Sequence, residues 1–130
     1  MVERIESSGM EDFEGIVEKI ELKEGIEGRQ QYELTIKPTS FVVKGPSGRM
    51  HEWLPMSKTA KDTSIAQGSV MDKFLMQVEI MFNEAKKKPT VTEELNILVG
   101  KKFKFKRLKL GRDFNEKKAR EYLVPVAYLA

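Results

Sequence analysis

Apolar and polar residues alternate along the first half of the chain with a period of two, which is the spacing of a half-buried strand. Residues 12–23 carry this alternation and predict a first strand. A bulge or bend is expected at Gly15, because glycine inside a strand often marks a kink. In residues 31–38 the apolar positions from Tyr32 to Ile36 share one face, which predicts a second strand with a buried side. Two glycines between these segments predict a turn.

Residues 40–56 are predicted to form either a hairpin or one long bent third strand, broken by a turn at the sequence GPSG. Beyond the turn, one face carries Arg49, His51 and Trp53, and the other carries Met50, Glu52 and Leu54. Either set fits an inward orientation. Trp53 is therefore either a core residue, with Glu52 outside, or an exposed aromatic residue.

The apolar period then changes to three and four, which indicates helix. Residues 68–89 carry a broad apolar stripe and predict one long helix that begins at a capping box of Ser69 and Asp72. The lysines that end this segment suit a helix C-terminus. A shorter helix is predicted over residues 90–101, with Thr92 as its N-cap and Gly100 as the residue that ends it.

Two further strands are predicted over residues 101–110 and 121–129. Phe103 and Phe105 alternate with lysines, so we expect the phenylalanines in the core and the lysines outside. A bulge in the middle of this strand would keep its two leucines inside as well. Pro125 lacks the N–H that a neighbouring strand needs, so the last strand is expected at an edge or with a bulge at that residue.

The resulting order of three strands, a helix and two strands resembles the oligonucleotide/oligosaccharide-binding (OB) fold. The expected fold is mainly β, a five-stranded OB-like Greek-key barrel with a long α-helix between strands three and four. Residues 12–130 are expected to form a single domain and residues 1–11 a flexible N-terminal tail. A chain of 130 residues, of which 40% are hydrophobic, is suited to one such core.

Charge is distributed unevenly, although the net charge is only +3. Residues 100–120 contain ten basic and two acidic residues, whereas the rest of the chain contains 13 basic and 18 acidic ones. This asymmetry is typical of a surface for nucleic acid or another acidic partner. It also occurs on the Lys/Glu-rich surfaces of proteins from hyperthermophiles.

Several classes of function are excluded or disfavoured by composition. The absence of cysteine excludes disulfides, thiolate zinc sites and iron–sulfur clusters. His51 is the single histidine, and no lysine-containing phosphate loop is present, so we expect no enzymatic activity, no metal and no cofactor. The acidic N-terminus has no apolar segment, and 18 apolar residues never run together, so we expect a soluble, cytoplasmic protein.

Nucleic-acid binding has the better support, because single strands are held by cationic grooves and by aromatic rings that stack on bases. Trp53 is the aromatic candidate if it faces outward, whereas Tyr32 is expected in the core. Phe114 lies in a polar loop and is either a base platform or a cap on one end of the barrel. The alternating lysines of residues 102–106 either bind phosphate or protect an edge strand from aggregation.

The segments GSVMDKFLMQVEIMF and ELNILVGKKFKFKR resemble small single-stranded-DNA-binding OB proteins of archaea and phages, of the replication protein A type. This resemblance implies a ligand across strands two and three, flanked by the loops after strands one and four, and a role in DNA replication or repair. The nucleic-acid-binding residues it implies are Arg29, Lys37, Lys44, Arg49, Trp53, Arg107, Lys109, Arg112 and Phe114. The alternative is an OB-type interaction or assembly module whose basic face contacts an acidic protein.

Overall fold

The computed structural model describes residues 12–25, 29–41, 48–56, 60–111 and 120–129. Within these ranges the strands are β1 (Asp12–Glu24), β2 (Gln30–Pro38), β3 (Met50–Pro55), β4 (Lys102–Lys109) and β5 (Glu121–Leu129). Between β3 and β4 lie α1 (Val70–Met81), a 3-10 helix (Asn83–Lys87) and α2 (Val91–Asn96). The predicted tail, residues 1–11, lies outside the described residues.

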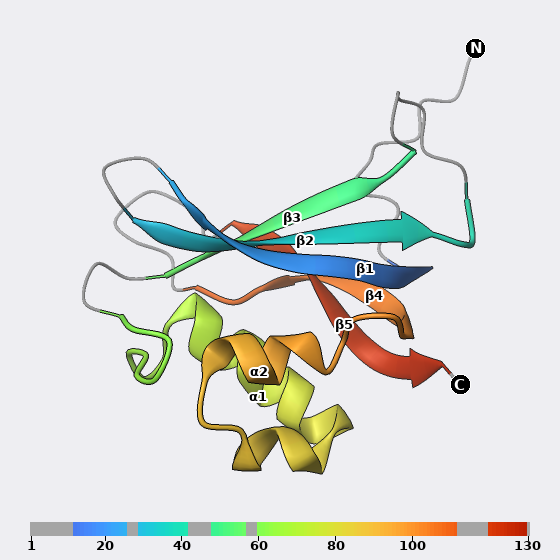
Figure 1. Cartoon of the computed structure of the whole chain (residues 1–130). Coiled ribbons are helices and arrows are strands. Elements are labelled where there is room, and N and C mark those ends of the chain that lie inside the picture. Colours follow the sequence, from blue (N-terminus) through green and yellow to red (C-terminus); the bar gives the residue numbers. More distant parts are fainter. Residues whose placement is uncertain (1–11, 26–28, 42–47, 57–59, 112–119, 130) are drawn as a thin grey trace.

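The strands form one five-stranded antiparallel sheet in the order β3-β2-β1-β4-β5. This confirms the mainly β class and the five strands that alternation predicted. β3 and β5 are the edges of the sheet, and no backbone pairing joins them within the described ranges. Figure 1 shows a strongly twisted sheet with the helices gathered on one side of it. α1 packs against β5 and β3, and α2 packs against β1.

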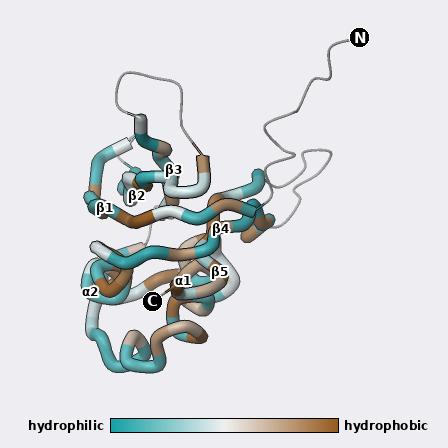
Figure 2. The backbone as a smooth tube through the Cα atoms, turned by 90° about the vertical axis from the view of Figure 1, so that its right-hand side faces the viewer, coloured by the Kyte–Doolittle hydropathy of each residue, from teal (hydrophilic) through white to brown (hydrophobic). Residues whose placement is uncertain are grey.

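The core lies between the sheet and the helices. Tyr32, Leu34 and Ile36 of β2 are buried, as are Phe103 and Phe105 of β4, so these orientations are confirmed. Hydrophilic and hydrophobic residues alternate along the strands in Figure 2, as a sheet with one buried face requires. No helix in the described part of the chain is long and apolar enough to cross a membrane.

Gly15 is not the site of the bulge in β1. The pairing of β1 with β2 shifts between Val17 and Lys19, so the extra residue is Glu18. Gly15 instead allows the strands to approach closely: a Cβ atom there would lie 2.9 Å from Ile36 Cγ2 and 3.1 Å from the carbonyl oxygen of Lys37. The predicted bulge at Gly15 is therefore wrong, and the close approach of the two strands explains the glycine at this position.

The expected bulge in the middle of β4 is also absent. The pairing of β4 with β5 shifts between Lys104 and Phe105, where β5 passes directly from Ala127 to Pro125 as partner, so the extra residue is Val126 of β5. A bulge beside Pro125 is what the missing N–H predicted. Because β4 keeps its alternation, Leu108 is exposed. Leu110 follows the last residue of β4, where the alternation has ended, and is buried.

The single long helix predicted over residues 68–89 is divided. Ser69 caps α1 as expected, since its hydroxyl accepts from Asp72 N at 3.2 Å, but α1 ends at Met81 because Phe82 is extended (φ −131°). In that position the Phe82 ring packs against Phe103 and Tyr128, with centroids 6.0 and 5.2 Å apart. Aromatic packing against the sheet thus outweighs continued helix.

α2 is present, but its N-cap is not the predicted residue. Thr90 Oγ1 accepts from Glu93 N, so the cap lies two residues before Thr92. Thr92 instead contacts Asp62 and Tyr32. Gly100 has φ +82° in the turn after α2, a backbone conformation that favours glycine, which supports its predicted role in stopping the helix.

Candidate nucleic-acid interface

Three rows of side chains cross β1, β2 and β3 on the side of the sheet away from the core. The strand pairing gives these rows as Lys19, Thr35 and His51; Glu21, Glu33 and Trp53; and Lys23, Gln31 and Pro55. We call this surface the outer face. Each row contains one residue from each strand, because paired residues of antiparallel strands point to the same side.

Trp53 lies half-buried on the outer face, while its neighbours Glu52 and Leu54 are buried on the core side. The alternative in which Trp53 fills the core is therefore wrong. The Lys23 ammonium nitrogen lies 5.5 Å from the centroid of the Trp53 ring, within the range of a cation–π contact. The indole thus combines an accessible aromatic surface with an adjacent positive charge.

Glu33 lies directly opposite Trp53 and is only 7% exposed. Its Oε1 is 3.0 Å from Lys23 Nζ, and its Oε2 is 3.9 Å from His51 Nδ1. Beside it, the buried Thr35 hydroxyl has no hydrogen-bond partner within the described part of the chain. The centre of the outer face therefore contains a carboxylate that is enclosed by its neighbours.

The margins of the outer face carry basic residues predicted from the sequence. Arg29 is exposed in the turn between β1 and β2, and Lys37 is exposed near the end of β2. Arg49 precedes β3 and forms an ion pair with Glu18, the bulged residue of β1. Of these three predicted cations, the structure assigns a carboxylate partner to Arg49.

The lysines of β4 lie beside acidic residues of β1. Lys102 Nζ is 3.6 Å from a Glu14 oxygen, and the ammonium groups of Lys104 and Lys106 are 3.5 and 4.0 Å from Asp12 oxygens. These pairs follow from the antiparallel register of β1 and β4. The alternating lysines therefore face carboxylates instead of forming a continuous cationic surface.

The other predicted residues are separated from the outer face or lie outside the described ranges. Arg107 and Lys109 are on β4, and β1 lies between β4 and β2 in the sheet. Arg107 is half-buried, and its Nε has no hydrogen-bond partner within the described residues. Lys44, Arg112 and Phe114 lie outside the described residues. Of the nine predicted residues, the structure brings Arg29, Lys37, Arg49 and Trp53 together on or beside the outer face.

Glu52 is an important residue that sequence reasoning did not identify. It is 3% exposed, and its carboxylate accepts from Leu123 N at 3.0 Å and from Arg120 Nη2 at 2.6 Å. Its Oε1 also accepts from Trp53 N at 3.0 Å. Glu52 therefore joins the two edge strands, β3 and β5, and fixes the backbone beside Trp53. Alternation placed Glu52 and Trp53 on opposite faces of β3, but nothing local decided which of them faces inward or identified the partners of Glu52.

Lys23 and Glu33 were also missed as members of the interface. Alternation places Glu33 on the same face as Lys37, which was a usable signal. The proximity of Lys23 to Trp53 depends on the pairing of β1, β2 and β3, which the sequence did not specify.

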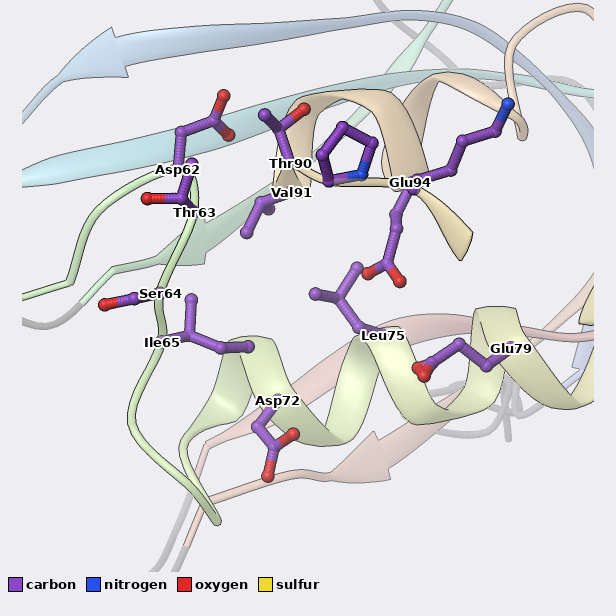
Figure 3. A pocket seen from close by; sticks show the side chains of 12 residues that line it. Asp62, Thr63, Ser64, Ile65, Asp72, Leu75, Glu79, Thr90, Val91 and Glu94 are labelled. Carbon is purple, nitrogen blue, oxygen red and sulfur yellow. The ribbon is translucent and has the colours of Figure 1, made fainter. Parts of the chain in front are cut away.

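A separate cleft of about 190 Å³ lies between α1, α2 and residues 62–65. Its lining includes Asp62, Asp72, Glu79 and Glu94, with one basic residue, Lys88. Figure 3 shows the Glu94 carboxylate pointing from α2 toward α1, on which Leu75 and Glu79 lie. An acidic cleft of this kind repels phosphate, so it is a poor candidate for the nucleic-acid interface.

Burial and the nearby charge of Glu79 raise the pKa of Glu94 to about 7. Asp62 behaves in the opposite way. Burial alone would raise its pKa, but hydrogen bonds from the Thr92 backbone, the Tyr32 hydroxyl and the Thr92 hydroxyl lower it. Burial also raises the pKa of Tyr32 to about 12. The Asp62, Tyr32 and Thr92 contacts tie the cleft to β2 and the start of α2.

The described residues indicate no metal centre, and comparison with known proteins identifies no family. The described residues contain no cluster of three or more His, Asp or Glu side chains that could hold a metal ion. No protein-family model matches the chain, and no curated protein is similar enough to count as a match.

Proposed function

We propose that the protein binds single-stranded nucleic acid on the outer face, largely without sequence specificity. The observation that carries this proposal is Trp53, which lies half-buried on the outer face at β3 with the Lys23 ammonium 5.5 Å from its ring centroid. Stacking of a base on such a ring contributes about 1 to 3 kcal/mol and tolerates any sequence, because every base has a π-face.

Phosphate neutralisation at the margins is the second part of the proposal. Arg29 and Lys37 are exposed, and they lie at the turn between β1 and β2 and near the end of β2. A strand that crosses the outer face would place its backbone near these cations while one or two bases lie on Trp53. Arg107 and Lys109 of β4 are in phase with the buried Phe103 and Phe105, on the other side of the sheet from the outer face, so the proposed contact does not include them.

We also propose that the sheet closes into an OB-type Greek-key barrel. The order β3-β2-β1-β4-β5 supports this, because it leaves β3 and β5 to close the barrel, and the Glu52 carboxylate bonds to Arg120 and Leu123 N at the start of β5. OB folds bind oligonucleotides on the face of strands two and three, with the loops after strands one and four. Trp53 lies on the corresponding face.

DNA is the preferred ligand in this proposal because of the resemblance to archaeal and phage single-stranded-DNA-binding proteins. A function in replication or repair follows from the same resemblance, whereas the proposed cytoplasmic location rests on the acidic N-terminus without an apolar segment. Catalysis, a metal and a cofactor have no part in it, since stacking and ion pairing account for binding.

The test is a titration of the protein with short oligonucleotides, followed by Trp53 fluorescence at several salt concentrations. The logarithm of the association constant should fall linearly with the logarithm of salt concentration, by about 0.7 per neutralised phosphate. Absence of binding at low salt would overturn the proposal.

A matched pair of variants sharpens this test. Lys37→Gln should flatten the salt dependence by about 0.7, because one phosphate contact is lost. Lys104→Gln is the control, since Lys104 Nζ already lies 3.5 Å from an Asp12 oxygen. Equal effects of the two substitutions would place the phosphates away from the margin of the outer face.

A protein-interaction or assembly module is the second candidate. Met76 and Ile80 of α1 are 54% and 77% exposed, and residues at this spacing lie on one side of a helix. Large exposed apolar side chains of this kind occur at protein interfaces. Concentration-dependent self-association in ultracentrifugation that Ile80→Lys abolishes, without any nucleic-acid binding, would favour this candidate over the first.

A further inference from the structure

The outer face contains a negative charge at the place where a phosphate-binding surface would have a positive one. The side chain of Glu33 is 9% exposed and lies directly across from Trp53. Its two carboxylate oxygens face Lys23 on β1 and His51 on β3. A phosphate above Trp53 would meet this carboxylate at short range, and repulsion between enclosed charges is screened weakly.

The same carboxylate determines where Lys23 lies. The four-carbon side chain of a lysine is flexible, and that of Lys23 is 42% exposed, so a fixed position requires a partner. Glu33 Oε1 provides one at 3.0 Å, and in that position the Lys23 ammonium lies 5.5 Å from the Trp53 centroid. The positive charge beside the indole is thus already balanced by Glu33.

We infer that Glu33 is a positioning residue that holds Lys23 against Trp53 and reserves the centre of the outer face for an uncharged nucleobase. The phosphates of the strand then lie along the margin, near Arg29 and Lys37. This inference rests on the proposed function, because it specifies which part of the nucleic acid contacts which part of the same surface.

A double-mutant cycle on Lys23 and Glu33 tests the inference, with the salt dependence of oligonucleotide binding as the readout. Lys23→Gln should leave the slope at its wild-type value, because Lys23 contacts no phosphate while Glu33 holds it. Glu33→Gln should steepen the slope by about 0.7, because the released lysine gains a phosphate. The double variant should return to the wild-type slope.

Glu84→Gln is the charge-matched control, because Glu84 is exposed on the 3-10 helix and not on the outer face. If Glu84→Gln steepens the slope as much as Glu33→Gln does, the effect is one of net charge and the inference fails. A flatter slope for Lys23→Gln would also overturn it, and this single variant is informative even if Glu33→Gln does not fold.

A second probe distinguishes base from phosphate directly. A strand of abasic sugar–phosphate units, equal in length and charge to the oligonucleotide, should leave Trp53 fluorescence unchanged, while the oligonucleotide quenches it. Equal quenching by both strands would contradict the inference. Failure of the wild-type protein to bind any oligonucleotide would instead refute the proposed function, so the two failures are distinguishable.

Discussion

Trp53 and Glu52 are neighbours on β3 that face opposite sides of the sheet. Alternation alone requires this opposition, but it does not say which residue is inside, and a carboxylate is the less expected choice for a core. The orientation is decided by partners far away in the sequence, since Arg120 and Leu123 N bond to Glu52. A buried carboxylate with such partners is satisfied, and the indole is left outside.

Removal of the Trp53 ring should weaken binding without loss of the fold. Trp53→Ala is expected to reduce the affinity for a labelled oligonucleotide by about 5- to 150-fold, which corresponds to the stacking of one base. Trp53→Phe should recover much of the loss, because the phenyl ring retains a stacking surface. Fluorescence anisotropy of the labelled strand measures both. Unchanged affinity of Trp53→Ala would show that the indole does not contact the ligand.

Glu52 should contribute to stability. Glu52→Gln is expected to lower the free energy of unfolding by about 1.5 to 3 kcal/mol, because hydrogen bonds to a charged group are lost or weakened at a buried position. Urea denaturation measures the change. Glu24→Gln, at an exposed position on β1, is the control and should shift the free energy by less than about 0.5 kcal/mol. A similar small change for Glu52→Gln would mean that Glu52 does not hold β3 and β5 together.

At the scale of elements, periodicity identified the strands and the start of α1, but it did not give their contacts. The segment that follows Phe82 has the spacing of a helix, yet packing of the Phe82 ring against Phe103 and Tyr128 ends α1 early. Similarly, the lysines of β4 are separated in the sequence from Asp12 and Glu14, so their pairing with β1 required the strand order. Local patterns predict elements well when no distant residue competes.

Substitution of Gly15 tests how closely β1 and β2 approach each other. Gly15→Ala should lower the free energy of unfolding by about 1 to 3 kcal/mol, because the new methyl group would lie 2.9 Å from Ile36 Cγ2. Gly111→Ala is the matched control, since a Cβ there would meet Val70 Cγ2 at an ordinary 3.6 Å. Equal midpoints of urea denaturation for the two variants would contradict the close packing of β1 against β2 at Gly15.

The contact between α1 and α2 should make stability depend on pH. Because the pKa of Glu94 is about 7 in the folded protein, above the ordinary value of 4.5, the folded state binds the proton more tightly than the unfolded state. The free energy of unfolding should therefore fall as pH rises from about 4.5 to 7. Urea denaturation across this range measures it.

Two substitutions can show whether this pH dependence arises from Glu94 and Glu79 in the acidic cleft between α1 and α2. Glu94→Gln should remove the fall in stability attributed to Glu94, because the glutamine does not titrate. Glu79→Gln should reduce the fall, because Glu79 is the charge that raises the pKa of Glu94 in addition to burial. A pH dependence that is identical in wild type and Glu94→Gln would show that Glu94 has no such role.

At the scale of the whole molecule, part of the charge asymmetry of the sequence is balanced between neighbouring strands. Residues 100–120 are strongly basic, but register places Lys102, Lys104 and Lys106 beside β1 carboxylates. The candidate binding surface is instead the outer face of β1, β2 and β3. Sequence analysis reached that surface through Trp53 and Arg49, and it missed Lys23 and Glu33 because their roles depend on three strands at once.

NMR can map the contacts of a single-stranded oligonucleotide on the outer face directly, through amide chemical-shift changes in the isotopically labelled protein. If the strand lies across the outer face, the largest changes will occur in residues 19–23, 31–37 and 49–55 and at the Trp53 indole N–H, with small changes in α1 and α2. Changes that concentrate on α1 and α2, or that leave the Trp53 indole unaffected at saturation, would contradict binding on the outer face.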